Sequence, residues 1–164
     1  MAEITRNRNQ RGSALILVPA AVLVLVILGA IAVDMSIVLL GQRELANMAA
    51  AAANDAATAA ISKEAFYRGG SGRAPGEVQI DDGEARHVVA HVLDVEVPRG
   101  VKVTRFDVQA PGSQVCVTVE GRVEYLFARA IPGVPHSTTV QGRARATAVR
   151  GPAGTSVPRS PGCG

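Results

Sequence analysis

The stretch that decides the fold is residues 13–33, SALILVPAAVLVLVILGAIAV, which contains no charged side chain. About 20 consecutive apolar residues are enough for a helix to cross the hydrocarbon core of a bilayer. Pro19 falls in the first two turns, where a transmembrane helix tolerates a proline. Apolar residues resume after Asp34 and continue to Leu40. The sequence therefore predicts a transmembrane helix over residues 13–40.

Positive charge lies on one side of this span. Arg6, Arg8 and Arg11 precede it, whereas the other side opens with Asp34. The positive-inside rule predicts a single-pass protein of the cell membrane, with residues 1–12 in the cytoplasm and the C-terminal domain outside. Arg11 and Asp34 are expected to mark the two membrane boundaries. An acid at such a depth can instead pair with a neighbouring subunit.

A cleavable signal peptide is the alternative interpretation. The arginines resemble a signal-peptide n-region, and Ala30-Ile31-Ala32 resembles a signal peptidase site. Cleavage after Ala32 would release a secreted envelope protein. It would also leave an apolar helix at the mature N-terminus, which favours the uncleaved anchor.

An alanine-rich stretch, residues 41–67, follows the span. Alanine is the best helix former, and no glycine or proline follows Gly41 within it. The stretch predicts a stalk helix continuous with the span, with Gly41 as the weak point. A helical stripe of small and apolar side chains runs along it: Leu45, Met48, Ala49, Ala52, Ala56 and Ala59. This stripe is expected either to belong to a solvated stalk or to pack against helices of other subunits, since small side chains permit close approach.

The rest of the chain predicts a small outer domain over residues 77–150, so the fold class is α+β. A Gly-rich hinge at residues 68–76 precedes it, and a Pro/Gly-rich tail at residues 151–164 is expected to be disordered. Asp81 and Asp82 predict a capped helix over residues 83–93.

Three β-like runs follow that helix and predict a three- to four-stranded, mostly antiparallel sheet: residues 102–109, 114–126 and 137–149. Residues 110–113 predict a hairpin connection between the first two runs. In the second run valines alternate with other residues from Val115 to Val119, which indicates one buried face, and Gly121 is expected to form a bulge.

Several N-terminal features together resemble a known family. They are Arg11-Gly12, an apolar span with a proline, Ala32-Val33-Asp34, and Arg43-x-Leu45 followed by an alanine tract. Over residues 11–61 this pattern resembles the TadE/TadG-like segment of pilin-like, membrane-anchored proteins of the bacterial Tad (Flp) pilus and related tight-adherence secretion systems. The resemblance implies a structural or assembly component whose partners are other pilus or secretion subunits, contacted through the N-terminal helix.

The same resemblance implies a processing site between Gly12 and Ser13. TadE-like pseudopilins have a glutamate five residues after this glycine, whereas this chain has Leu17. TadG-like members often have an aspartate in the first alanine cluster, whereas here Asp55 comes later. The resemblance therefore points to the superfamily and not to one subtype.

The remaining chemistry predicts neither an enzyme nor a cofactor site. His87 and His91 lie four residues apart on the predicted helix, but the glutamate of a zincin pair is missing. A metal-dependent enzyme built on these histidines is the third interpretation, and a structural role for both is preferred. The net charge of +3 with few aromatic residues argues against nucleic acid, and no motif indicates a small-molecule substrate.

The sequence contains two cysteines, Cys116 in a β-like run and Cys163 in the tail. A bridge between them would require an oxidising compartment. A buried thiol at Cys116 is the expectation.

Overall fold

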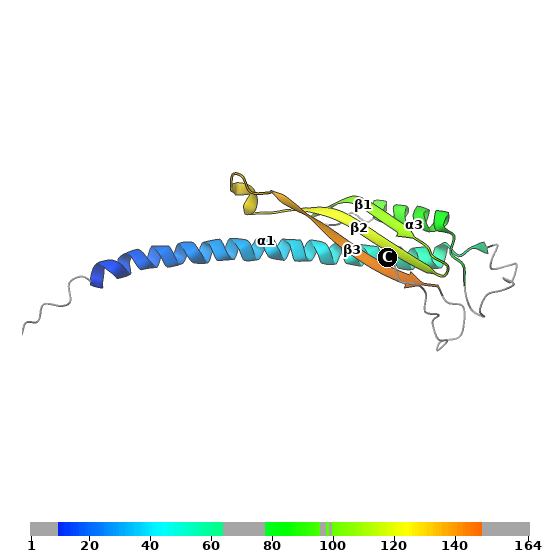
Figure 1. Cartoon of the computed structure of the whole chain (residues 1–164), viewed down its shortest axis with the longest axis horizontal. Coiled ribbons are helices and arrows are strands. Elements are labelled where there is room, and N and C mark those ends of the chain that lie inside the picture. Colours follow the sequence, from blue (N-terminus) through cyan, green and yellow to red (C-terminus); the bar gives the residue numbers. More distant parts are fainter. Residues whose placement is uncertain (1–9, 64–77, 96–97, 99, 149–164) are drawn as a thin grey trace, which may run out of the picture.

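One long helix, α1 (Gln10–Ala59), runs almost the whole length of the molecule, and the other elements pack beside its second half (Figure 1). The structure is a computed structural model that describes residues 10–63, 78–95, 98 and 100–148. The predicted hinge at residues 68–76 and tail at residues 151–164 lie outside these ranges. The fold class is α+β, as the sequence predicts.

Helix α1 is continuous through Gly41, the predicted weak point, and it contains Pro19. Gly41 is buried, and a Cβ atom there would lie 2.6 Å from Cγ2 of Val123. The helix has 50 residues, which correspond to about 75 Å at 1.5 Å per residue. It ends at Ala59, before the predicted end, and Ile61 then forms a β-bridge with Ile80.

Three strands form one antiparallel sheet in the order β1–β2–β3: β1 (Val101–Gln109), β2 (Gln114–Glu124) and β3 (Ser137–Thr147). These bounds confirm the three predicted runs to within a few residues. The predicted hairpin joins β1 to β2, and Gly112 adopts a φ of 70° in its turn, a conformation that favours glycine.

The prediction of a bulge at Gly121, on β2, is wrong, because the bulge lies on β1. Val103 pairs with Gly121 and Arg105 pairs with Glu120, so Thr104 on β1 is the extra residue. The Thr104 hydroxyl donates a hydrogen bond to the carbonyl oxygen of Glu120 at 3.2 Å. Sequence reasoning chose the glycine because glycine often marks a bulge, but here the extra residue bonds to the opposite strand through its side chain.

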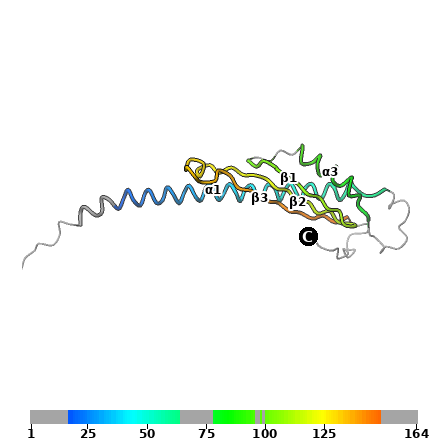
Figure 2. The backbone as a smooth tube through the Cα atoms, turned by 45° about the horizontal axis from the view of Figure 1, so that its top comes forward, coloured from blue at the N-terminus to red at the C-terminus, as the bar shows by residue number. Residues whose placement is uncertain are grey.

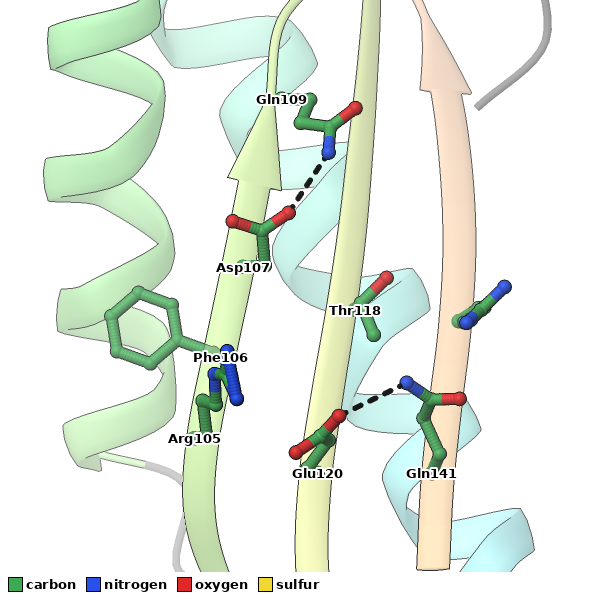
Figure 3. Close-up of a pocket in the computed structure, with 8 residues that line it drawn as sticks. Arg105, Phe106, Asp107, Gln109, Thr118, Glu120 and Gln141 are labelled. Atoms are coloured by element: carbon green, nitrogen blue, oxygen red, sulfur yellow. Dashed lines mark hydrogen bonds between the residues drawn. The ribbon is translucent and has the colours of Figure 1, made fainter. Parts of the chain in front are cut away.

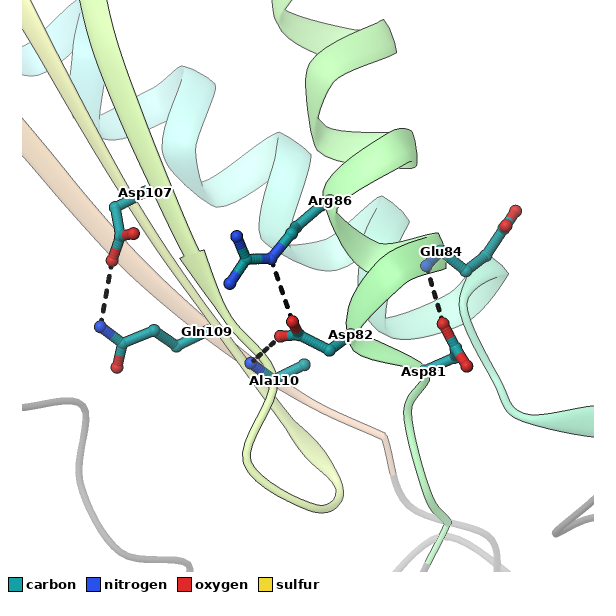
Figure 4. Close-up of polar contacts among 7 residues, drawn as sticks. All are labelled: Asp81, Asp82, Glu84, Arg86, Asp107, Gln109 and Ala110. Carbon is teal, nitrogen blue, oxygen red and sulfur yellow. Dashed lines mark hydrogen bonds and ion pairs between the residues drawn. The ribbon is translucent and has the colours of Figure 1, made fainter.

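Helix α3 (Asp82–Val95) confirms the predicted capped helix (Figure 4). The Asp81 carboxylate accepts a hydrogen bond from the backbone N–H of Glu84 at 2.8 Å, which satisfies one of the N–H groups left unpaired at a helix start. The Asp82 carboxylate accepts from the backbone N–H of Ala110 at 3.2 Å and from Nε of Arg86 at 3.0 Å. Asp82 therefore fastens α3 to the β1–β2 turn.

The core lies between α1 and one face of the sheet, with α3 beside α1 (Figure 2). The inward residues of β2 are fully or almost fully buried: Val115, Val117, Val119 and Val123. They confirm the buried face that the alternation in this strand predicts. The opposite face of the sheet carries polar and charged side chains, so the domain has two layers and one open sheet face.

The helix and the sheet approach each other unusually closely at Gly142 on β3. A Cβ atom at Gly142 would lie 2.5 Å from the backbone nitrogen of Ala46 and 2.5 Å from the carbonyl oxygen of Leu45. Real Cβ atoms do not come this near to backbone atoms, so only glycine fits without moving the helix. The alanines of α1 permit the same close packing along the rest of the contact.

Substitution of Gly142 by alanine is expected to destabilise the outer domain. The added methyl group meets helix backbone, which cannot rotate away, so we expect a loss at the upper end of the overpacking range, about 3 kcal/mol of unfolding free energy. Urea denaturation of the detergent-solubilised chain measures this. Gly29→Ala is the matched control, since a Cβ at Gly29 meets nothing within 4 Å. Equal stability of the two variants would contradict the close approach.

Candidate functional site

The first half of α1 exposes its apolar side chains. Leu17, Leu25 and Val26 are 67%, 67% and 66% exposed, and the exposed positions continue on all sides of the helix as far as Val33. Among the described residues this is the one helix long and apolar enough to cross a membrane. An apolar surface of this size in water would be strongly unfavourable, so it needs a lipid or protein environment.

Asp34 is the first buried residue after the exposed half, with 8% of its surface accessible. Its Oδ1 atom accepts hydrogen bonds from the backbone N–H groups of Leu126 at 2.8 Å and Phe127 at 3.0 Å. Its Oδ2 atom accepts one from Ala128 at 2.9 Å. These three residues lead into the short 3-10 helix η1 (Ala128–Ala130) in the β2–β3 loop. We call this arrangement the Asp34 clasp.

The Asp34 clasp provides hydrogen-bond acceptors for backbone N–H groups of the β2–β3 loop. The N–H groups at the start of a short helix have no backbone partner within it, and a carboxylate is the strongest acceptor that a side chain can offer them. Both Asp34 oxygens are thus engaged within the chain, which differs from the interpretation in which this acid pairs with a neighbouring subunit. Exposed apolar side chains continue beyond Asp34 at Met35, Leu39 and Leu40, so the membrane boundary at Asp34 stays a prediction.

The predicted helix-packing stripe is covered by the chain itself. Five of its residues are buried: Leu45, Met48, Ala49, Ala52 and Ala56. The sixth, Ala59, is exposed, and Ala60 is buried instead. The stripe faces the sheet and α3, so neither a solvated stalk nor a surface left open to other subunits describes it. The sequence could not show this, because a small-residue stripe fits a sheet as well as a helix.

The predicted processing residues Gly12 and Ser13, like Arg11, lie in the first turns of α1. The arginines Arg6 and Arg8 are outside the described residues. The structure therefore places the predicted boundary residues Arg11 and Asp34 on one continuous helix, with the exposed apolar residues 17–33 between them.

Cys116 is disulfide-bonded and lies on β2 with 6% of its surface exposed. The expectation of a buried thiol is therefore wrong. The sequence holds one other cysteine, Cys163, which is outside the described residues. Disulfides form and persist in oxidising compartments.

The open face of the sheet carries a shallow polar hollow (Figure 3). Gln141 donates a hydrogen bond to the Glu120 carboxylate at 3.3 Å, and Gln109 donates one to Asp107 at 3.0 Å. The remaining lining residues are Arg105, Phe106, Thr118 and Arg143. The hollow is therefore lined mainly by charged and amide side chains.

His87 and His91 are both exposed on α3. In the part of the chain that the structure describes, no three histidine, cysteine, aspartate or glutamate side chains gather closely enough to hold a metal ion. The histidine pair therefore gains no further ligand from the fold.

No protein-family model matches the chain, and no curated protein or solved structure matches it either. Three features of the molecule bear on its function. They are the exposed apolar half of α1, the Asp34 clasp at its end, and the small domain built on the second half of the same helix.

Asp34→Asn is expected to loosen the β2–β3 loop. The amide keeps one acceptor oxygen and turns a donor toward a backbone N–H, so we expect a loss of about 1–3 kcal/mol in stability. Hydrogen exchange of the amides of Leu126, Phe127 and Ala128 should become faster. Asp55→Asn, an exposed acid on the same helix, is the control and should leave these amides unchanged. Unchanged exchange in the Asp34 variant would show that the carboxylate does not hold the loop.

Proposed function

We propose that this protein is a membrane-anchored structural or assembly component of a bacterial Tad (Flp) pilus or a related tight-adherence secretion system. The observation that carries the proposal is the division of α1 into two halves. Residues 17–33 are exposed and apolar, whereas most apolar residues from Leu45 to Ala57 are buried under a sheet. The TadE/TadG-like pattern of residues 11–61 supports the pilus system in particular.

The division of α1 suggests how such a subunit would work. In the bilayer, lipid covers the exposed half of α1, and the unassembled subunit stays anchored in the membrane. In an assembly, the same half exchanges lipid for the corresponding helices of other subunits, and its small residues such as Ala21 and Gly29 permit close packing. The buried stripe does not take part, because the chain's own sheet covers it. The partners are therefore other pilus or secretion subunits, contacted through residues 13–33.

An extracytoplasmic position of the outer domain is part of the proposal. Two independent features support it. Arg6, Arg8 and Arg11 precede the span, which favours a cytoplasmic N-terminus. Cys116 is disulfide-bonded, which favours an oxidising environment for the sheet.

A secreted envelope protein is the second candidate, and one feature of the fold favours it. Asp34 and all the core residues come after Ala32 in the chain, so cleavage there would leave the Asp34 clasp and the core in one piece. The helix that remains after the cut is covered by the sheet from Gly41 onward. Cleavage would therefore remove most of the exposed apolar surface and leave only Met35, Leu39 and Leu40 as large exposed apolar side chains on the rest of α1.

A structural role also accounts for the chemistry of the surface. The outer sheet face presents charged and amide groups, and among the described residues the histidines of α3 belong to no cluster that could hold a metal ion. We propose no enzymatic activity, no cofactor, no small-molecule substrate and no nucleic acid for this chain.

The mature N-terminus separates the candidates. Intact mass of the protein purified from membranes of its native host is expected to show either processing before Ser13 or an uncut chain, because both keep the exposed half of α1. A start at Ser13 would favour a pilus subunit or pseudopilin, and a start at Met1 or Ala2 would favour a permanent assembly component. A start at Val33 would contradict the anchor and support the secreted protein.

Deletion of the gene is expected to reduce surface fibres and adherence, counted by electron microscopy and by retention on a solid surface. The wild-type chain should restore both, whereas Leu25→Arg should not, since an arginine at mid-span costs about 2.5–3.5 kcal/mol and cannot pack among helices. Asn54→Arg is the matched control, because Asn54 lies on the exposed face of the second half of α1. Intact fibres in the deletion strain would overturn the pilus role.

A further inference from the structure

The β2–β3 loop, residues 125–136, exposes a second and separate apolar cluster. Leu126, Phe127, Ile131 and Val134 are 49%, 46%, 54% and 37% exposed. Single exposed apolar residues are ordinary, but four of them within one loop are not. We call these four side chains the loop cluster.

The loop that carries this cluster has a fixed backbone. Its ends are joined by a hydrogen bond from the N–H of Tyr125 to the carbonyl oxygen of His136 at 2.9 Å. Inside it, the N–H of Ile131 bonds to the carbonyl oxygen of Ala128 at 3.1 Å, and the N–H of Val134 bonds to that of Ile131 at 3.3 Å. The apolar side chains are therefore presented by an ordered turn and need not be ordered on binding.

The Asp34 clasp fixes the position of the loop cluster along the axis of α1, relative to the uncharged segment of residues 13–33. Residues 13–33 form an uncharged helix of about 31 Å at 1.5 Å per residue, which matches a hydrocarbon core of about 30 Å. If this segment fills the core, Asp34 lies at its outer boundary. The clasp joins Asp34 to Leu126 and Phe127, so these residues lie at the same level. Figure 1 shows η1 at the end of the domain that faces the exposed half of α1.

The charge of the loop suits a lipid headgroup region. Residues 125–136 contain no aspartate or glutamate, and their one arginine, Arg129, is exposed. Aromatic and apolar side chains together with a cation are the combination that settles into a membrane interface. The arginine can pair with lipid phosphates while the apolar side chains enter the acyl boundary.

We propose that the loop cluster inserts into the outer leaflet of the membrane that the N-terminal helix spans, with Arg129 on the lipid phosphates. The inference rests on the membrane anchor in the proposed function and extends it. The occupant is lipid because the Asp34 clasp joins the loop cluster to the exposed apolar part of α1, where Met35, Leu39 and Leu40 also remain exposed. A second attachment point beside the span would hold the sheet in one orientation over the bilayer.

Tryptophan fluorescence in vesicles tests this, because the chain contains no tryptophan. The full chain with Phe127→Trp, or with Ile131→Trp as a second loop probe, is reconstituted in phosphatidylcholine vesicles whose acyl chains are brominated near the headgroup. Phe106→Trp is the matched control, since Phe106 is 42% exposed on β1, far from the loop. Leu25→Trp reports whether the N-terminal segment of α1 is inserted in the bilayer. We expect both loop probes to lose about half of their emission to the bromines and to emit further to the blue.

The outcomes separate the inference from the anchor. Quenching of Leu25→Trp and of both loop probes, with Phe106→Trp unquenched, supports the inference. Quenching of Leu25→Trp with loop probes that behave like Phe106→Trp overturns it and leaves the anchor intact. Loop probes that shift to the blue without quenching would show burial against a second copy of the chain, which also overturns it. An unquenched Leu25→Trp would overturn the anchor and the inference together.

Discussion

The close contact between the backbone of α1 and β3 is the constraint on which the structure depends. At Gly142 a single methyl group would collide with the helix backbone at Leu45 and Ala46. Alanines along α1 and glycines on the strands let the two layers approach until little space remains between them. This packing compensates for the scarcity of aromatic side chains. Close contact between the helix and the sheet gains dispersion energy that large aromatic side chains would otherwise supply.

The same contact divides one helix between two environments. Up to Val33 its side chains are apolar and mostly exposed. Beyond Asp34 one side is covered by the sheet, while the other side still exposes Met35, Leu39 and Leu40 before it becomes polar. Asp34 connects the two layers at this point, because its carboxylate binds three backbone N–H groups of the β2–β3 loop. The domain is thereby held at a fixed position along the helix, which a flexible linker would not achieve.

Local signals in the sequence were sufficient to predict the helices, the strands and the hairpin turn. The capped helix after Asp81 and the turn at Gly112 rest on interactions between residues near each other in the chain, and the three strands could be recognised from the residue pattern within each run. The bulge was assigned to the wrong strand, because its position depends on how two strands pair. The stalk was taken for a separate unit, since periodicity shows that α1 has a small-residue side but not what covers it.

The sequence by itself determined the uncharged span, the α+β class and the two halves of the N-terminal helix, because composition and period act within one segment. Only the tertiary structure decided that the alanine stripe packs on the chain's own sheet and that Cys116 is bonded. It also decided that Asp34 holds the loop 92 residues further on. Such contacts depend on three-dimensional proximity, which an aspartate, an alanine or a cysteine does not reveal in a single sequence.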